Sequence, residues 1–187
     1  MSRSLSPPWS HPIRISELSL RHATPVLLEP DADTCRALAA DLGIDALRKL
    51  RFDAVLSPTR TRDWQLRARL GATVVQPCVV TGAPVTTRID EEVSRLYLAD
   101  MPEIEVEPGA EIEMPLDDMI DPLPAILDLG LVMAEALALA LPLYPRAEGA
   151  ALEQAQFAAP GVDPMRDEDA LPFSGLKALR DKLADKE

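Results

Sequence analysis

The chain has few of the residues that usually carry catalysis or bind metals. Its 187 residues include two cysteines, two histidines and 4% aromatic residues. Cys35 and Cys78 are too few for a disulfide framework and fit a reducing cytoplasm. No phosphate-binding glycine loop, dinucleotide glycine fingerprint or zinc-type cysteine spacing occurs. We therefore expect an aliphatic core, no cofactor, no metal and no small-molecule substrate.

Negative charge is concentrated in the second half of the chain. The net charge is −12, and residues 96–187 carry 20 acidic residues against 6 basic ones. Residues 1–95 carry 13 basic residues against 11 acidic ones. A field this negative repels nucleic acid, so any RNA contact must be local, whereas the acidic half attracts basic proteins.

The longest apolar run, Leu127–Leu141, predicts a helix rich in alanine, leucine and methionine. Asp128 can cap its N-terminus, and Pro142 stops it. Because residues 129–141 are apolar nearly all round, we expect a buried helix around which a sheet wraps. The helix is too short to span a bilayer, which takes about 20 apolar residues. Its one internal carboxylate, Glu135, must pair, accept hydrogen bonds or become protonated.

Alternating apolar and polar residues predict an antiparallel meander before this helix. The period-two pattern begins at Leu50, and the residues from Trp64 to Leu70 form a clean half-buried strand that continues through Val74 and Val75. Pro77 breaks the ladder, so that position is an edge, a bulge or a strand end. A turn at 81–84 leads to a return strand from Val85 to Tyr97, with an irregularity expected at Glu91 and Glu92. Residues 13–20 and 25–28 are weaker strand candidates.

Flanking helices complete the prediction. Asp31 caps a helix that runs to Leu42, with Gly43 beyond its end and Cys35 on its buried face. The predicted fold class is α+β: a twisted antiparallel meander packed on a central apolar helix, with flanking short helices and disordered tails. The predicted divisions are a flexible arm (1–11), a single α+β domain (12–146), a flexible acidic linker (147–170) and a C-terminal docking helix (171–187).

Four arginines form the best candidate for an RNA contact: Arg60, Arg62, Arg67 and Arg69. Arg60 and Arg62 lie in a predicted loop. The alternation along residues 64–70 directs Arg67 and Arg69 away from the apolar face of the strand, to which Trp64 belongs. The alternative is a solvated strand face. Acidic residues at 103–121 lack the ligand spacing of a calcium loop and are read as a solvated loop, with a short strand at 111–114. A nucleophilic pair of Cys78 and His22 is conceivable, but nothing in the sequence supports it over chance.

Three blocks in order resemble one family: CVVTGAPVTTRIDEE (78–92), DLGLVMAEALALALPLYPR (128–146) and PFSGLKALRDKL (172–183). They are similar to the YceD-type large ribosomal RNA subunit accumulation proteins over residues 70–146 and the C-terminal block. The positions that match the family motif are Cys78, Thr81, Gly82, Asp128, Glu135 and Pro142. Many relatives have a second cysteine where this chain has Thr81, and some have cysteines where it has residues 143–146, so a metal site is not expected here.

The resemblance implies a cytoplasmic, non-enzymatic protein needed for the synthesis, processing or stability of large-subunit ribosomal RNA. It also suggests that Glu135 is a buried acceptor that fastens the helix to the sheet. The expected partner is then a large-subunit ribosomal RNA precursor or a ribosomal protein, and no contact with a membrane is expected. The alternative is an acidic, chaperone-like module that binds a basic ribosomal protein without touching RNA.

Overall fold

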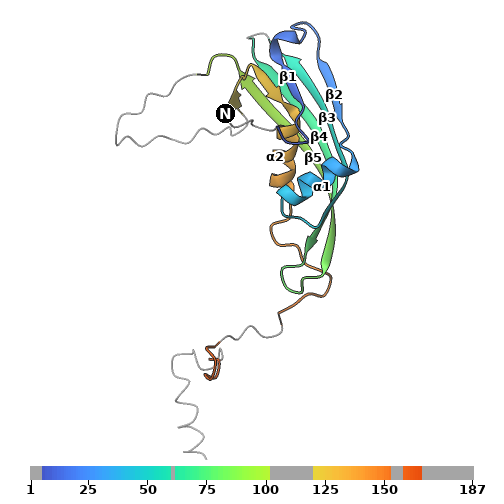
Figure 1. Ribbon diagram of the computed structural model, residues 1–187. Coiled ribbons are helices and arrows are strands. Elements are labelled where there is room, and N and C mark those ends of the chain that lie inside the picture. The colour runs from blue at the N-terminus through green and yellow to red at the C-terminus, as the bar shows by residue number, and fades with distance from the viewer. Residues whose placement is uncertain (1–5, 60–61, 102–119, 153–157, 166–187) are drawn as a thin grey trace, which may run out of the picture. The chain divides into compact units, whose positions relative to one another are not determined.

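The structure is a computed structural model that describes residues 6–59, 62–101, 120–152 and 158–165. Residues 1–148 and 149–187 form two separate units, and the elements below belong to the first. In chain order they are β1 (Pro12–Arg14), the 3-10 turn η1 (Ile15–Glu17), β2 (Thr24–Leu28), α1 (Ala32–Asp41), β3 (Ala46–Pro58), β4 (Trp64–Pro77), β5 (Pro84–Leu98), β6 (Ile120–Pro122), β7 (Ile126–Asp128) and α2 (Leu129–Ala140) (Figure 1).

Five strands form one mixed sheet in the order β2-β3-β4-β5-β6. The predicted antiparallel meander is present, because β2, β3, β4 and β5 pair antiparallel with their neighbours. The short strand β6 was not predicted, and it pairs parallel with β5. The fold class is therefore α+β, but the sheet is mixed and not wholly antiparallel.

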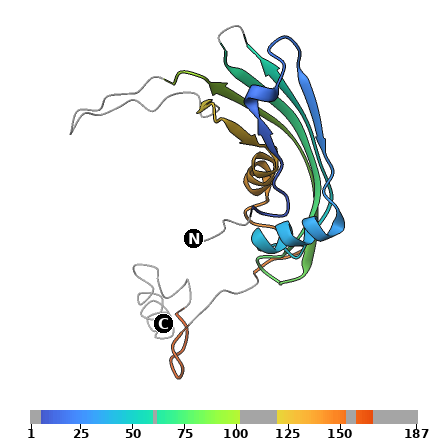
Figure 2. The same cartoon turned by 45° about the horizontal axis from the view of Figure 1, so that its top comes forward.

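The other elements all cover one side of this sheet, which we call the inner face. Figure 2 shows the sheet curving around α2, with α1 and the two-stranded β1–β7 ribbon on the same concave side. Leu38 of α1, Phe52 and Leu66 of the sheet, and Met133 and Leu137 of α2 are completely buried between the two layers. Burial of apolar surface here is the main stabilising term of the fold.

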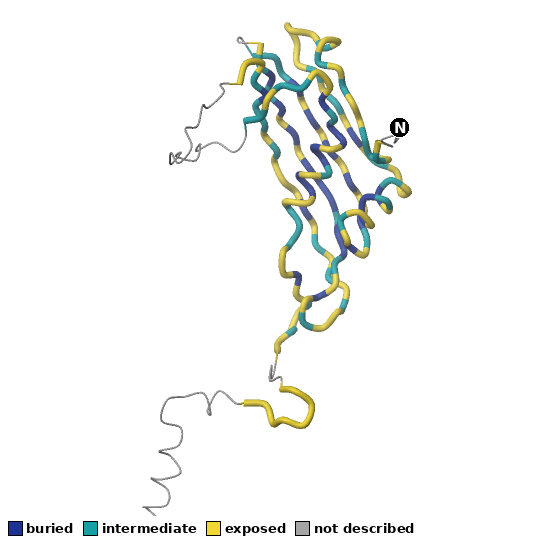
Figure 3. Tube along the Cα trace, turned by 60° about the vertical axis from the view of Figure 1, so that its left-hand side comes forward, coloured by how far each residue is buried: buried dark blue, intermediate teal, exposed yellow. Residues whose placement is uncertain are grey.

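The opposite side, which we call the outer face, is exposed. Figure 3 shows buried and exposed residues alternating along the long strands. As predicted, Trp64 and Leu66 point into the core, and Arg67 and Arg69 are on the exposed side. No element among the described residues packs on this side of β3, β4 and β5.

A bulge explains why the pattern of β3 was recognised four residues late. Its pairing with β4 shifts between Arg48 and Arg51, where Lys49 adopts a φ of 52°. The extra residue lets both Leu47 and Leu50 point inward, so the period of two is broken there. The irregularity expected at Glu91 and Glu92 of β5 is wrong, since β5 pairs with β4 without a shift.

Both helices begin and end where the sequence predicts. The Asp31 carboxylate accepts the N–H of Thr34 at the start of α1, and Gly43 beyond its end has a φ of 66°. Asp128 accepts the N–H groups of Gly130 and Leu131 at the start of α2. The expectation that α2 is buried all round is wrong, because Leu131 is 49% exposed and Leu139 is 77% exposed.

The N-terminal residues contact the start of α2. The Ser10 hydroxyl and the N–H of His11 donate to the Asp128 carboxylate, and His11 accepts the N–H of Leu129. The segment predicted as a flexible arm thus includes residues bonded to the domain. The predicted docking helix at 171–187, the strand at 111–114 and most of the acidic run lie outside the described residues. The linker and the docking helix stay predictions.

Candidate functional site

The arginines of the outer face lie among carboxylates. Arg69 stands directly between Asp53 and Glu92 in the strand register, and its guanidinium lies 3.4 Å from the Glu92 carboxylate. Arg88 pairs with Asp90 at 2.5 Å on the same face of β5. Such exposed pairs contribute little to stability, but they lower the local positive charge.

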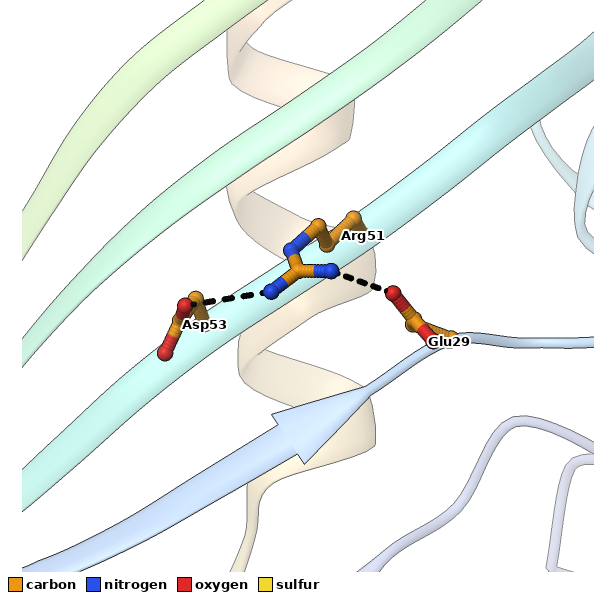
Figure 4. A network of polar contacts seen from close by, with 3 residues as sticks. All are labelled: Glu29, Arg51 and Asp53. Atoms are coloured by element: carbon orange, nitrogen blue, oxygen red, sulfur yellow. Dashed lines mark hydrogen bonds and ion pairs between the residues drawn. The ribbon is translucent and has the colours of Figure 1, made fainter.

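Arg51 is held in the same way between two acids. Its guanidinium lies 2.5 Å from Glu29 and 3.4 Å from Asp53 (Figure 4). Glu29 follows the end of β2, whereas Asp53 lies two residues further along β3. The positive charge of Arg51 is therefore also offset on this face.

Arg67 differs from these arginines. It is exposed between Val55 and Ser94 in the register, and no ion pair holds it within the part of the chain that is described. Arg62 is exposed in the loop before β4, with a φ of 65°, whereas Arg60 lies outside the described residues. Of the four predicted RNA-contacting arginines, Arg62 and Arg67 thus have no ion pair among the described residues, whereas Arg69 is paired.

Cys78 lies in a tight turn between β4 and β5 that also contains Thr81 and Gly82. The N–H of Cys78 donates to Ala83, and the N–H of Gly82 donates back to Cys78, where Gly82 adopts a φ of 71°. A glycine is favoured there because a Cβ is strained at positive φ.

The segment after α2 closes over this turn. Pro145 accepts the N–H of Val79, Pro142 accepts the Gln76 side-chain amide, and the N–H of Ala147 donates to the Cys78 sulfur at 3.3 Å. Two blocks of the family motif that are far apart in sequence therefore meet at Cys78.

This environment makes Cys78 acidic. The Thr81 hydroxyl and the N–H of Ala147 stabilise the thiolate and lower the pKa of Cys78 to about 6, although burial acts against them. Burial raises the pKa of the other thiol, Cys35, above its usual value.

These opposite shifts predict a simple titration. Thiolate absorbance near neutral pH is expected to show one transition with a midpoint near 6, which disappears in Cys78→Ser and persists in Cys35→Ser. Thr81→Val should move the midpoint upward, because it removes the largest stabilising hydrogen bond. Since the folded pKa is the lower one, this group adds stability above the unfolded pKa and loses it as pH falls through about 6. A single transition above pH 8, in the ordinary range of a free thiol, would contradict the prediction.

The structure does not bring Cys78 and His22 together. His22 precedes Thr24, which aligns with Leu56 and through it with Leu66 near the start of β4. Cys78 directly follows Pro77 at the other end of β4. Eleven residues of β4 separate these two levels, or about 35 Å at the rise of a strand.

Glu135 connects α2 to the sheet through Arg95. The Arg95 guanidinium on β5 lies 2.8 Å from the Glu135 carboxylate and 3.1 Å from that of Asp121 on β6. The Arg95 side chain is 16% exposed and that of Glu135 is 53% exposed, so the suggestion that Glu135 is buried is wrong. Arg95 is the nearly buried partner, and it ties a helix and two strands to one another.

The family described as "Large ribosomal RNA subunit accumulation protein YceD" matches residues 66–180, more than half of the chain. The chain belongs to the YceD family. Comparisons with curated proteins and with solved structures found no match.

Within the region that matches the YceD family, the motif positions occupy two structural sites. Cys78, Thr81, Gly82 and Pro142 lie in or beside the cysteine turn, whereas Asp128 and Glu135 attach α2 to its neighbours. Partial burial acts to raise the pKa of Asp128, but the hydrogen bonds from Ser10 and from three backbone N–H groups outweigh it and hold that pKa below its usual value.

Two members of the Glu135 site, Arg95 and Asp121, were missed by the sequence argument. Arg95 stands at an inward-facing position of its strand, two residues before Tyr97, and an arginine at such a position calls for a carboxylate partner. That signal could have identified it. In the described part of this YceD-family chain, no cluster of three or more metal-ligating side chains occurs and no helix is long and apolar enough to cross a membrane.

Proposed function

We propose that the protein is a non-enzymatic, cytoplasmic ribosome-biogenesis factor that supports the accumulation of large-subunit ribosomal RNA through contact with a basic protein partner. The description of the YceD family supports large-subunit ribosomal RNA as the RNA whose accumulation depends on the protein. The observation that carries the choice of partner is the pairing of outer-face arginines with carboxylates in a chain whose net charge is −12.

Electrostatics favours a protein partner over RNA. A surface that neutralises phosphates needs several unpaired cations, because each contributes separately to counterion release. Here Arg51, Arg69 and Arg88 already have acidic partners. A strongly acidic chain instead attracts basic proteins, of which a growing ribosomal subunit contains many.

In-cell crosslinking tests this proposal directly. The protein is crosslinked in growing cells, purified under denaturing conditions, and its covalent partners are identified as RNA or protein. We expect a basic ribosomal protein to be recovered and large-subunit RNA to be recovered only through that protein. Direct RNA crosslinks without a protein partner would overturn the proposal.

A second candidate is direct RNA contact through Arg67, which its exposure and its lack of an ion pair among the described residues favour. Arg69, Arg62 and the undescribed Arg60 would then extend the contact along the strand and the adjoining loop. Four phosphate contacts give a salt slope of about −3 to −4, whereas one contact gives a slope of about −1.

Charge reversal at Arg67 separates the two candidates. If the partner is a protein, Arg67→Glu leaves large-subunit RNA accumulation at the wild-type level in a complemented deletion strain, and binding of the purified protein to an RNA fragment has a salt slope no steeper than about −1. Arg14→Glu, an exposed position outside the sheet face, is the matched control. A slope near −3 that Arg67→Glu reduces, together with lost accumulation in cells, would favour RNA.

A further inference from the structure

The edge of β5 is open over most of its length. Among the described residues, β5 pairs on this side with β6 through Leu96, Tyr97 and Leu98. Residues 84–95 pair with β4 on the other side and have no second neighbouring strand in the described part of the chain. An unpaired strand edge of this kind can accept another strand.

Even-numbered residues direct their backbone groups toward this edge. The carbonyl of Leu98 accepts the N–H of Leu123 at 2.8 Å across it. Because alternate residues of a strand direct their N–H and C=O groups to the same side, Ser94, Glu92 and Asp90 present theirs to the edge as well. The side chains of these three residues are exposed on the outer face.

A groove runs beside this edge, between β5 and α2. It has a volume of about 320 Å³ and is lined by Glu91, Val93, Arg95, Ala136, Leu139 and Ala140. Leu139 is 77% exposed, although it belongs to the helix that supplies much of the core. The groove thus combines unpaired backbone groups on one wall with apolar side chains on the other.

The surroundings of the groove are acidic. Four carboxylates accompany three guanidinium groups there, namely Glu91, Glu92, Asp121 and Glu135 against Arg67, Arg69 and Arg95. Arg69 and Arg95 are engaged by those acids, whereas Arg67 and Glu91 have no ion pair within the described residues. An extended segment that carries lysine or arginine complements this charge.

We propose that the groove between β5 and α2 binds an extended basic segment of a partner protein, which adds as a strand to β5 and places an apolar side chain against Leu139. The backbone groups of Ser94 and Glu92 provide hydrogen bonds, and alternate side chains of the segment face the apolar wall. The inference rests on the proposed function, since it gives the surface by which the basic partner is held.

The probe for this site is a short labelled peptide of alternating lysine and valine, with a glutamate–valine peptide as its charge-reversed counterpart. Binding to the full chain is measured by fluorescence anisotropy, and amide hydrogen exchange of the chain is measured by NMR. We expect the lysine–valine peptide to bind and the glutamate–valine peptide not to bind. Binding should slow exchange at the N–H groups of Ser94 and Glu92, while the odd-numbered amides bonded to β4 are already protected.

Two variants address the backbone wall and the apolar wall separately. Ser94→Pro removes an N–H that faces the edge and spares the pairing with β4, and Ser94→Ala is its matched control. Leu139→Ser removes the apolar contact, and Leu143→Ser, at a position beyond the helix that is 85% exposed, is its control. Ser94→Pro and Leu139→Ser should each weaken peptide binding by about tenfold or more, and the two controls should not.

Several results would overturn the inference. Equal binding to the wild type, Ser94→Pro and Leu139→Ser would place the peptide elsewhere. Binding that needs Leu139 but leaves the Ser94 and Glu92 amides unprotected would mean that a helix occupies the groove. Slow exchange of these amides in the free chain would show that the chain covers its own edge.

Failure of this site and failure of the proposed function are distinguishable. If the peptide binds as expected but cells with Ser94→Pro accumulate large-subunit RNA normally, the groove stands and the proposed function fails. If no basic peptide binds but a ribosomal protein still crosslinks in cells, the function stands and the groove is wrong.

Discussion

Leu137→Ala lowers the free energy of unfolding by about 2–5 kcal/mol, because it leaves a cavity between α2 and the sheet. Leu137 is completely buried, as are Leu129 and Met133 on the same side of the helix. The removed methyl groups lose both their transfer free energy and their packing contacts. The midpoint of denaturant unfolding, monitored by circular dichroism, measures the change.

Leu131→Ala is the control in the same helix. Its side chain is 49% exposed, so we expect a loss below about 1 kcal/mol. Both variants have the same change in helix propensity, so the difference between them isolates burial. Equal costs for the two would mean that α2 does not pack on the sheet through one side.

The sequence predicts the elements whose signals are local. Asp31 and Asp128 are recognised as caps because a carboxylate that precedes a helix satisfies free N–H groups. The inward-facing residues of β4 follow from alternation alone, since every second side chain faces the core. The strand β6, three residues long in an acidic and proline-containing segment, has no period that can be recognised.

Long-range pairing was not predictable in the same way. The apolar run around Glu135 predicts that this carboxylate needs a partner, but the partner, Arg95, lies 40 residues earlier on β5. The arginines of the outer face form a basic cluster in the sequence, whereas the strand register places Asp53 and Glu92 on either side of Arg69. Charge along the chain thus differs from charge on the surface, because the sheet brings distant residues side by side.

Gly130→Ala is expected to destabilise the protein by ~3 kcal/mol, near the upper end of what overpacking costs. In an exposed helix the same change stabilises by roughly 0.5–1 kcal/mol, since alanine is the better helix former. Here an added Cβ would lie 1.7 Å from the carbonyl oxygen of Trp9 and 2.9 Å from the backbone nitrogen of His11. Backbone atoms cannot rotate away, so the N-terminal segment must move and lose its hydrogen bonds to Asp128 and Leu129.

A double-mutant cycle with a chain that lacks residues 1–11 tests this cause. Without Trp9 and His11 the clash is absent, so Gly130→Ala should become neutral or stabilising by roughly 0.5–1 kcal/mol in the shortened chain. The chain has two tryptophans, Trp9 and the buried Trp64, and Trp9→Phe separates their fluorescence signals. The fluorescence of Trp9 should shift to the red in full-length Gly130→Ala, because the N-terminal segment is released. An equal loss of stability in both chain lengths would mean that the N-terminal segment does not determine the effect, and that the space around the first turn of α2 is limited by another part of the domain.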